Sequence, residues 1–205
     1  MTKIFSLIAA AMVAVSLSTQ AQASLTSDVS ANVQNLQMAL QVHIQLAAGL
    51  NWHVGDKASY ALDIGGFMKG TSNNFVREDA GTAFWMEQDM VVSGQSQKIE
   101  ALVNKSTGQI EKLLLNGQPQ DVPKSDTEVL EMHEDHITVQ AGTFDCVYAK
   151  IRDKSDQKIT EAWLNPKVVP MSGILKAIGD SQYGKVTQEV TSMSFASAPA
   201  PTPHN

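Results

Sequence analysis

The sequence predicts a mainly β fold of the α+β class: a curved antiparallel sheet or half-open β-barrel wrapped around one long N-terminal helix. From Trp52 onward, apolar residues recur at every second position, which is typical of half-buried strands. Turn signals such as Gly65-Gly66 and Asn116-Gly117 divide that region at short intervals. The segment before it has apolar residues three and four positions apart, which is the helical period.

The first 23 residues predict a signal peptide. Lys3 precedes an uncharged, mainly apolar run from Ile4 to Leu17, and Ala21-Gln22-Ala23 supplies the small residues of a cleavage site. The run is shorter than the roughly 20 apolar residues that span a bilayer, so a retained membrane anchor is the weaker alternative. We expect cleavage near Ala23 and a bacterial protein that is periplasmic or secreted, with no membrane anchor.

Residues 24–49 are expected to form the N-terminal helix. No charged residue stands between Asp28 and Asp56, and one helical stripe contains Val29, Val33, Leu36, Leu40 and Ile44. A helix without charges is either covered by the protein or lies against something apolar outside it. We favour the first, because helices on membrane surfaces usually carry Lys or Arg on the polar face.

Residues 50–195 are expected to form the sheet, in one domain with the helix. In the second half of this region, alternation predicts strands at 127–133, 136–140, 143–152, 157–164, 172–178 and 185–195. Residues 196–205, ASAPAPTPHN, are rich in Ala and Pro and are predicted to be a disordered tail.

The stretch VQAGTFDCVYAKI, residues 139–151, is apolar on both faces of its predicted strand. Phe144, Cys146 and Tyr148 alternate with Val147 and Ala149. One face is expected to meet the helix or an inner cavity, and the other a neighbouring segment or a partner. Gly142 in this stretch suits a turn or bulge that needs positive φ.

The composition excludes several function classes. The formal net charge is −6, and removal of Lys3 with the signal peptide makes it −7, which opposes binding to nucleic acid. Cys146 is the only cysteine, so no internal disulfide can form. No Lys, Arg or His lies within two residues of Cys146, which indicates a small buried hydrophobe in preference to a reactive thiol.

Two motifs resemble ligand sites but have simpler structural readings. GDSQYGKV, residues 179–186, matches a phosphate loop except that Val186 replaces the hydroxyl residue, and the alternation after it predicts a hairpin. EMHEDH, residues 131–136, brings His133 and His136 close in sequence. Positions three apart point to opposite faces of a strand, so we expect a polar turn at Glu134-Asp135 and no metal.

No pattern supports catalysis, so the protein is predicted not to be an enzyme and to need no cofactor. The sequence contains neither a G-x-S-x-G elbow nor a C-x-x-C pair. Glu87 and Asp89 share a strand face, and such a pair is more often the wet side of a sheet than an acid and base.

Large apolar side chains within the strands form the candidate binding site. Aromatic residues in strands are normally core, but a sheet that is concave toward an apolar helix could leave a slot for acyl chains. Methionine adapts to such ligands as readily as to irregular cores. The residues assigned to this apolar concave face are Trp52, Phe84, Met86, Phe144, Tyr148 and Trp163.

Four stretches resemble poorly characterised secreted bacterial proteins whose sheet is similar to the half-barrel of the periplasmic lipoprotein carriers. These stretches are Trp52–Asp56 with Tyr60, Asn104–Gly108 with Ile110 and Lys112, Val139–Phe144 with Cys146 and Tyr148, and Glu161–Pro166 running into Val169–Lys176. The resemblance spans roughly residues 50 to 195. It implies a curved antiparallel half-barrel over a helix, and binding of lipid-like or other apolar ligands.

The expected function is therefore that of an exported, non-catalytic carrier for an apolar or lipid ligand in the cell envelope. The alternative is an envelope interaction or assembly accessory without a small ligand. Such an accessory would bind a partner protein through an exposed edge strand or through the apolar outer face of residues 143–151.

Overall fold

The computed structural model describes residues 50, 52–122, 127–154, 157–181 and 184–196. The predicted signal peptide (1–23), the predicted helix (24–49) and the tail beyond Ala196 lie outside the described residues. The predicted sheet region is almost entirely included.

The described chain forms eleven strands in one antiparallel sheet. The strands are β1 (Lys57–Ile64), β2 (Met68–Asp79), β3 (Ala83–Val92), β4 (Gln95–Asn104), β5 (Ile110–Leu115), β6 (Gln118–Gln120), β7 (Thr127–Val139), β8 (Gly142–Asp153), β9 (Ile159–Leu164), β10 (Ile174–Ser181) and β11 (Gly184–Ser194). Their order in the sheet is β6-β5-β4-β3-β2-β1-β11-β10-β9-β8-β7.

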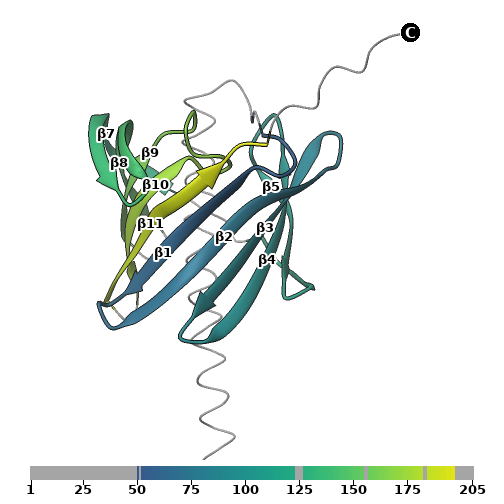
Figure 1. Ribbon diagram of the computed structural model, residues 1–205, viewed down its shortest axis with the longest axis horizontal. Coiled ribbons are helices and arrows are strands. Elements are labelled where there is room, and N and C mark those ends of the chain that lie inside the picture. The colour runs from purple at the N-terminus through teal and green to yellow at the C-terminus, as the bar shows by residue number, and fades with distance from the viewer. Residues whose placement is uncertain (1–49, 51, 123–126, 155–156, 182–183, 197–205) are drawn as a thin grey trace, which may run out of the picture.

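The sheet consists of two meanders joined at one seam. Strands β1 to β6 pair in sequence order, as do β7 to β11, and β1 pairs with β11 to unite them. Figure 1 shows a strongly bent sheet, with β1, β2 and β11 at its centre and β7–β10 and β3–β5 as two flanks. Because β6 and β7 do not pair, the sheet is open, as the half-open prediction required.

The hydrophobic core lies on the face of the sheet that carries Tyr60, Leu62, Val76, Phe84 and Met86, which we call the inner face. Alternation along each strand sends their neighbours to the opposite, outer face. In β1, for example, every second residue is buried. The period-two pattern in the sequence therefore correctly predicted these strands.

The connection between β9 and β10, residues 165–173, contributes to this core. Val169 and Met171 are fully buried, and the Tyr60 hydroxyl lies 3.3 Å from the Ser172 hydroxyl. Gly173 has φ +71°, and a Cβ there would meet the backbone of Pro166 at 3.1 Å. Glycine is therefore required where this connection turns back into β10.

Two predicted turns had different outcomes. The GDSQYGKV segment forms the predicted hairpin, since Ser181 at the end of β10 pairs with Gly184 at the start of β11. The turn predicted at Glu134-Asp135 is wrong, because β7 runs unbroken from Thr127 to Val139. Charged residues are tolerated within this strand because it lies at the sheet edge, where both side-chain rows reach water.

The β7–β8 hairpin bends over the outer face. Gly142 in its turn has φ +139°, as expected, and the Gln140 amide N–H donates to Glu189 Oε1 on β11 at 3.0 Å. Val139 and Cys146 become buried as a result. The second apolar face of residues 139–151 is thus partly covered by the protein's own hairpin.

Candidate functional site

The two edges of the sheet differ in how open they are to another strand. β6 has three residues, and its central residue, Pro119, has no backbone N–H. β7 has thirteen residues and no proline. Short edge strands and prolines are the usual protection against unwanted pairing, so β6 is a protected edge and β7 is not.

Most of β7 is exposed. Nine of the side chains in its sequence TEVLEMHEDHITV are exposed, among them Val129, Leu130 and Met132 with 43%, 37% and 46% of their surface accessible. Among the described strands, β7 pairs only with β8. One row of its backbone N–H and C=O groups therefore has no partner strand in the described part of the chain.

The exposed edge is acidic. Glu128, Glu131, Glu134 and Asp135 lie on β7. Arg152 Nη1 lies 3.6 Å from Glu128 Oε2, and His133 Nδ1 lies 3.4 Å from Glu131 Oε1. Two copies of this edge placed side by side would bring carboxylates together, which disfavours pairing with itself.

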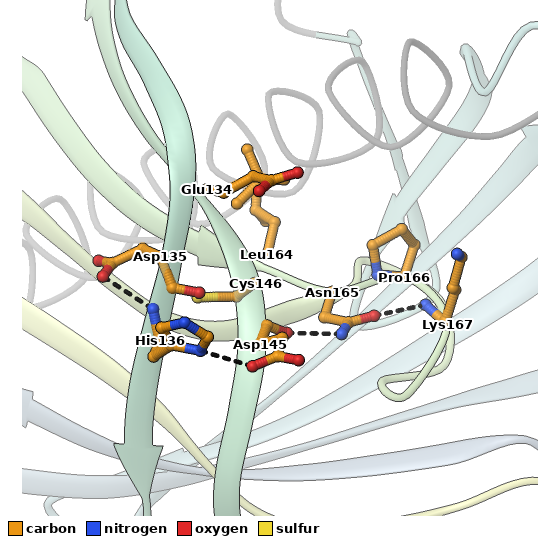
Figure 2. Close-up of a pocket in the computed structure, with 10 residues that line it drawn as sticks. Glu134, Asp135, His136, Asp145, Cys146, Leu164, Asn165, Pro166 and Lys167 are labelled. Carbon is orange, nitrogen blue, oxygen red and sulfur yellow. Dashed lines mark hydrogen bonds and ion pairs between the residues drawn. The ribbon is translucent and has the colours of Figure 1, made fainter.

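A pocket of about 640 Å³ opens beside β7, at the junction of β7, β8 and β9. Figure 2 shows its lining residues, with the carboxylates on the strands and Lys167 on the connection that follows β9. It is lined by Glu134, Asp135, His136, Asp145, Cys146, Val147, Leu164, Asn165, Pro166 and Lys167.

Hydrogen bonds hold the polar wall of this pocket. Asn165 Nδ2 donates to the Asp145 carbonyl at 2.7 Å, and Asn165 Oδ1 accepts from the Lys167 amide at 3.0 Å. On β7, His136 Nδ1 lies 2.5 Å from Asp145 Oδ1. Such a charged, hydrogen-bonded lining suits a polar group more than an acyl chain.

Asp135 is held in its charged form. Its carboxylate accepts from the His136 amide at 2.8 Å and from Trp163 Nε1 at 2.9 Å. These bonds, the His136 amide first, lower the pKa of Asp135 below its ordinary value. The edge therefore keeps this negative charge at neutral pH.

Cys146 is a poor nucleophile. Burial, and then the negative charges of Asp135 and Asp145, raise the pKa of its thiol to about 11. The Sγ atom donates to the Asp135 carbonyl at 3.4 Å. A protonated thiol in this setting matches the interpretation of Cys146 as a small buried side chain.

The histidines of the EMHEDH segment point to opposite faces of β7, as strand geometry predicts. His133 packs on the Tyr148 ring of the outer face, whereas His136 approaches Asp145. Within the described residues, no three or more His, Cys, Asp or Glu side chains are arranged to hold a metal ion.

The six predicted ligand-binding residues do not share one face. Trp52, Phe84 and Met86 lie in the core, and the rings of Trp52 and Phe84 are 5.8 Å apart. The strand register places Tyr148 and Trp163 on the outer face, their ring centroids 5.2 Å apart, and Phe144 has the same parity on β8. The alternation was read correctly, but it cannot show which side of each strand faces the core.

The sequence interpretation missed two features of this region. His133 and Asp135 were assigned to a solvated turn, yet His133 contacts Tyr148 on the adjacent β8 and Asp135 accepts from Trp163 on β9, one strand further on. Glu87, expected on the wet side, is 5% exposed and lies 2.5 Å from Lys98 Nζ. The alternation placed the residues on strands, but only the strand order reveals these partners.

Comparisons with known proteins give no family assignment. No family model and no curated protein matches the chain. Among the described residues, no helix is both long enough and apolar enough to span a membrane.

Solved structures show similarity only at the level of a related β-sheet fold. The hypothetical protein CT021 from Chlamydia trachomatis is 13% identical, with 76% of this chain and 94% of that chain covered and a TM-score of 0.48. MucB in the Pseudomonas aeruginosa MucA/MucB complex is 15% identical, with 85% of this chain covered and a TM-score of 0.46. A separate MucB crystal structure is 14% identical over 87% of this chain, with a TM-score of 0.42. The chain spans 59% to 62% of those MucB chains, and no conclusion about function rests on these likenesses.

Proposed function

We propose that this protein is a non-catalytic interaction module of the cell envelope that binds an extended segment of a partner protein along β7. The observation that carries this proposal is the long, exposed and proline-free edge at β7, opposite an edge that is short and blocked by Pro119. The envelope location rests on the predicted signal peptide.

Backbone pairing would supply the affinity. An added strand takes up the row of N–H and C=O groups that has no partner strand in the described part of the chain, while side-chain positions two apart give specificity. The part of the edge that no described strand covers extends over residues 128–136, because the hairpin tip beyond it folds against β11. Val129, Leu130 and Met132 offer apolar contacts on the two faces of that stretch.

Charge selects the kind of segment. The four carboxylates of β7 favour a basic partner strand and disfavour an acidic one, since like charges directly opposite each other destabilise a strand pair. Surface charge also raises the rate of encounter with an opposite charge, and salt weakens that effect. We therefore expect a basic, extended segment as the partner.

A model peptide tests this assignment. A short peptide that alternates arginine and threonine should bind the full chain and protect the outward-facing amides of residues 128–136 from hydrogen exchange. The same peptide with alternate backbone nitrogens methylated loses donors and should bind much more weakly. Binding that protects amides only outside β7 would exclude the edge as the site.

A matched pair of variants separates the edge from general surface effects. Leu130→Pro places a residue without an N–H in the middle of the exposed edge and should weaken binding. A control with proline at Val91 is unsuitable, because Val91→Pro would disrupt paired strands. The matched comparison therefore uses lysine: Leu130→Lys on the edge and Val91→Lys on β3, both at exposed apolar residues. Equal losses for the two lysine variants would contradict the proposal.

A carrier for an apolar ligand is a second candidate. Trp52 Nε1 and Gln88 Oε1 are buried and have no hydrogen-bond partner within the described part of the chain, and both residues belong to strands or segments that line the inner face. Buried polar atoms usually have a partner, and the head group of a bound ligand would provide one. Mass spectrometry of an organic extract of the purified protein should then detect a lipid, and a clean extract would argue against this candidate.

A further inference from the structure

Three rings form a continuous surface on the outer face beside β7, which we call the aromatic patch: His133 on β7, Tyr148 on β8 and Trp163 on β9. The His133 and Tyr148 rings are 4.9 Å apart, and the Tyr148 and Trp163 rings 5.2 Å. The strand register aligns all three in one row across the sheet. All three side chains keep part of their surface accessible.

A hydrogen bond beside the patch links β9 to β7 across the outer face. Trp163 Nε1 donates to Asp135 Oδ2 at 2.9 Å, although β8 lies between their two strands. Neighbouring strands are about 4.8 Å apart, so the long Trp163 side chain extends across β8 on the outer face to reach Asp135. A side chain that lies over Tyr148 would therefore be flanked on both sides.

Carboxylates surround the patch. Glu161, Glu131 and Asp135 lie near the Tyr148 hydroxyl, and burial together with these charges raises the pKa of Tyr148. Lys150 lies between Glu131 and Glu161 in the register, and Lys176, beside Trp163, is 3.4 Å from Glu189. The carboxylates thus outnumber the cations around the rings.

The protein fills comparable positions on other rings with its own cations. Arg77 lies over the Trp85 ring at 5.2 Å, and Lys105 lies over the Phe84 ring at 4.2 Å. Neither of these two contacts involves the aromatic patch.

We propose that the aromatic patch binds the guanidinium group of an arginine side chain carried by the segment that pairs with β7. The inference rests on the proposed function and names the residue that gives the edge its specificity. In an added strand, the residue opposite His133 points its side chain to the outer face. Arginine is long enough to reach Tyr148 from there, and its planar group stacks on rings better than the lysine ammonium does.

A small probe tests the patch without any strand pairing. N-acetylarginine methylamide, titrated into the full chain, should cause saturable NMR shifts of the Trp163 indole N–H, which is assigned by its loss in Trp163→Phe. The glutamine analogue is the neutral control. The Trp85 indole is an internal control, because Arg77 already covers its ring. Equal shifts of both indoles, or none at all, would overturn the inference.

Variants separate the rings from the charges. Tyr148→Leu removes the central ring and should weaken binding of the arginine–threonine peptide by roughly two- to fivefold, as expected for a partly exposed cation–ring contact. Glu161→Gln preserves shape and should also weaken binding, with a smaller dependence on salt. A peptide that alternates lysine and threonine should bind less tightly than the arginine peptide; equal binding would overturn the inference.

The outcomes also distinguish this inference from the proposed function. Suppose that the arginine peptide protects β7 and that Tyr148→Leu binds it as well as the unaltered protein does. The proposed binding along β7 would then be supported and the arginine site would be refuted. If the small probe shifts the NMR signal of the Trp163 indole N–H but no peptide protects β7 from exchange, the proposed binding along β7 would be refuted instead. Shifts caused by a methyl glucoside and not by the arginine probe would assign the patch to sugars, and the inference would be wrong.

Discussion

Tyr60 illustrates how a single buried group can control stability at high pH. The side chain is fully enclosed and its hydroxyl lies 3.3 Å from Ser172 Oγ, in the connection that covers the inner face. Burial raises the pKa of the Tyr60 phenol to about 12, partly offset by the Ser172 hydroxyl. In the unfolded chain the phenol ionises near pH 10.

We therefore predict that stability falls as the pH rises from about 10 to 12. In that window the unfolded phenol loses its proton while the folded one keeps it, so ionisation favours unfolding by up to roughly 3 kcal/mol. Tyr60→Phe should remove this part of the fall. The free energy of unfolding, measured by urea titration at pH 8 and pH 11, checks it. An equal loss of unfolding free energy between pH 8 and pH 11 in Tyr60→Phe and in the unaltered protein would contradict the prediction.

Asp56 connects the two ends of the described chain. Its buried carboxylate accepts from the His53 amide and from the Ala196 amide, each at 2.8 Å. The Asp56 backbone also bonds with Val76 on β2. The side chain thereby joins the turn before β1 to the segment after β11.

Asp56→Ala is predicted to destabilise the protein by about 1–3 kcal/mol. Two partly buried amides would lose their acceptor, and donors left unsatisfied away from water are costly. Asp121→Ala is the matched control, because that carboxylate is exposed and should change stability by less than about 0.5 kcal/mol. Thermal and urea unfolding of both variants decide the point, and similar stability of the two would refute a role for the Asp56 contacts.

At the scale of elements, β2, β3 and β4 are linked on the outer face by an ion-pair network. Glu87 and Glu100 face each other directly across β3 and β4, and both are nearly buried. Arg77 on β2 forms an ion pair with Glu100 and lies 3.6 Å from Glu87, while Lys98 lies 2.5 Å from Glu87. Two adjacent carboxylates are stable here because cations flank them.

Arg77→Met is predicted to destabilise the sheet by roughly 1–3 kcal/mol, because it leaves Glu87 and Glu100 facing each other with less compensation. Adding Glu100→Gln should restore part of the loss, because the variant no longer holds two opposing charges. A double-mutant cycle from urea unfolding gives the coupling. Strictly additive effects would show that the network contributes little.

At the scale of the whole molecule, stability depends on the seam between the two meanders. β1 and β11 hold residues near the two ends of the described chain, and Tyr60 lies opposite Val190 across this seam. Both side chains are buried, and the strands on either side continue the sheet without a break. The β1–β11 pairing makes the two meanders one sheet, and that sheet encloses a single core.

Amide exchange should follow this architecture. We predict the slowest exchange in β1, β2 and β11 and the fastest in β6 and in residues 128–136 of β7, because central strands open only with global unfolding and edges open locally. Hydrogen–deuterium exchange with mass spectrometry measures this order. Uniform protection across the sheet, or a fast β1–β11 seam, would contradict it.

Much of the fold was predictable because burial in a sheet alternates locally. The strand at Lys57–Ile64 shows its pattern within eight residues, and the hairpin at Ser181–Gly184 follows from glycine beside alternating residues. The positive φ of Gly142 was predicted for the same reason. The continuous β7 was missed, because two acidic residues in a row resemble a turn wherever the strand's place in the sheet is unknown.

The sequence by itself determined that residues 50–195 alternate as strands, although not that β7 is continuous, that both sides of residues 139–151 need cover, and that Cys146 has no local cation to activate it. Only the tertiary structure decided that β1 joins β11, that β7 is the open edge, and that Tyr148 and Trp163 lie on the opposite face from Phe84. The reason is physical: alternation is set by neighbours along the chain, whereas strand order and facing depend on contacts between residues far apart in sequence.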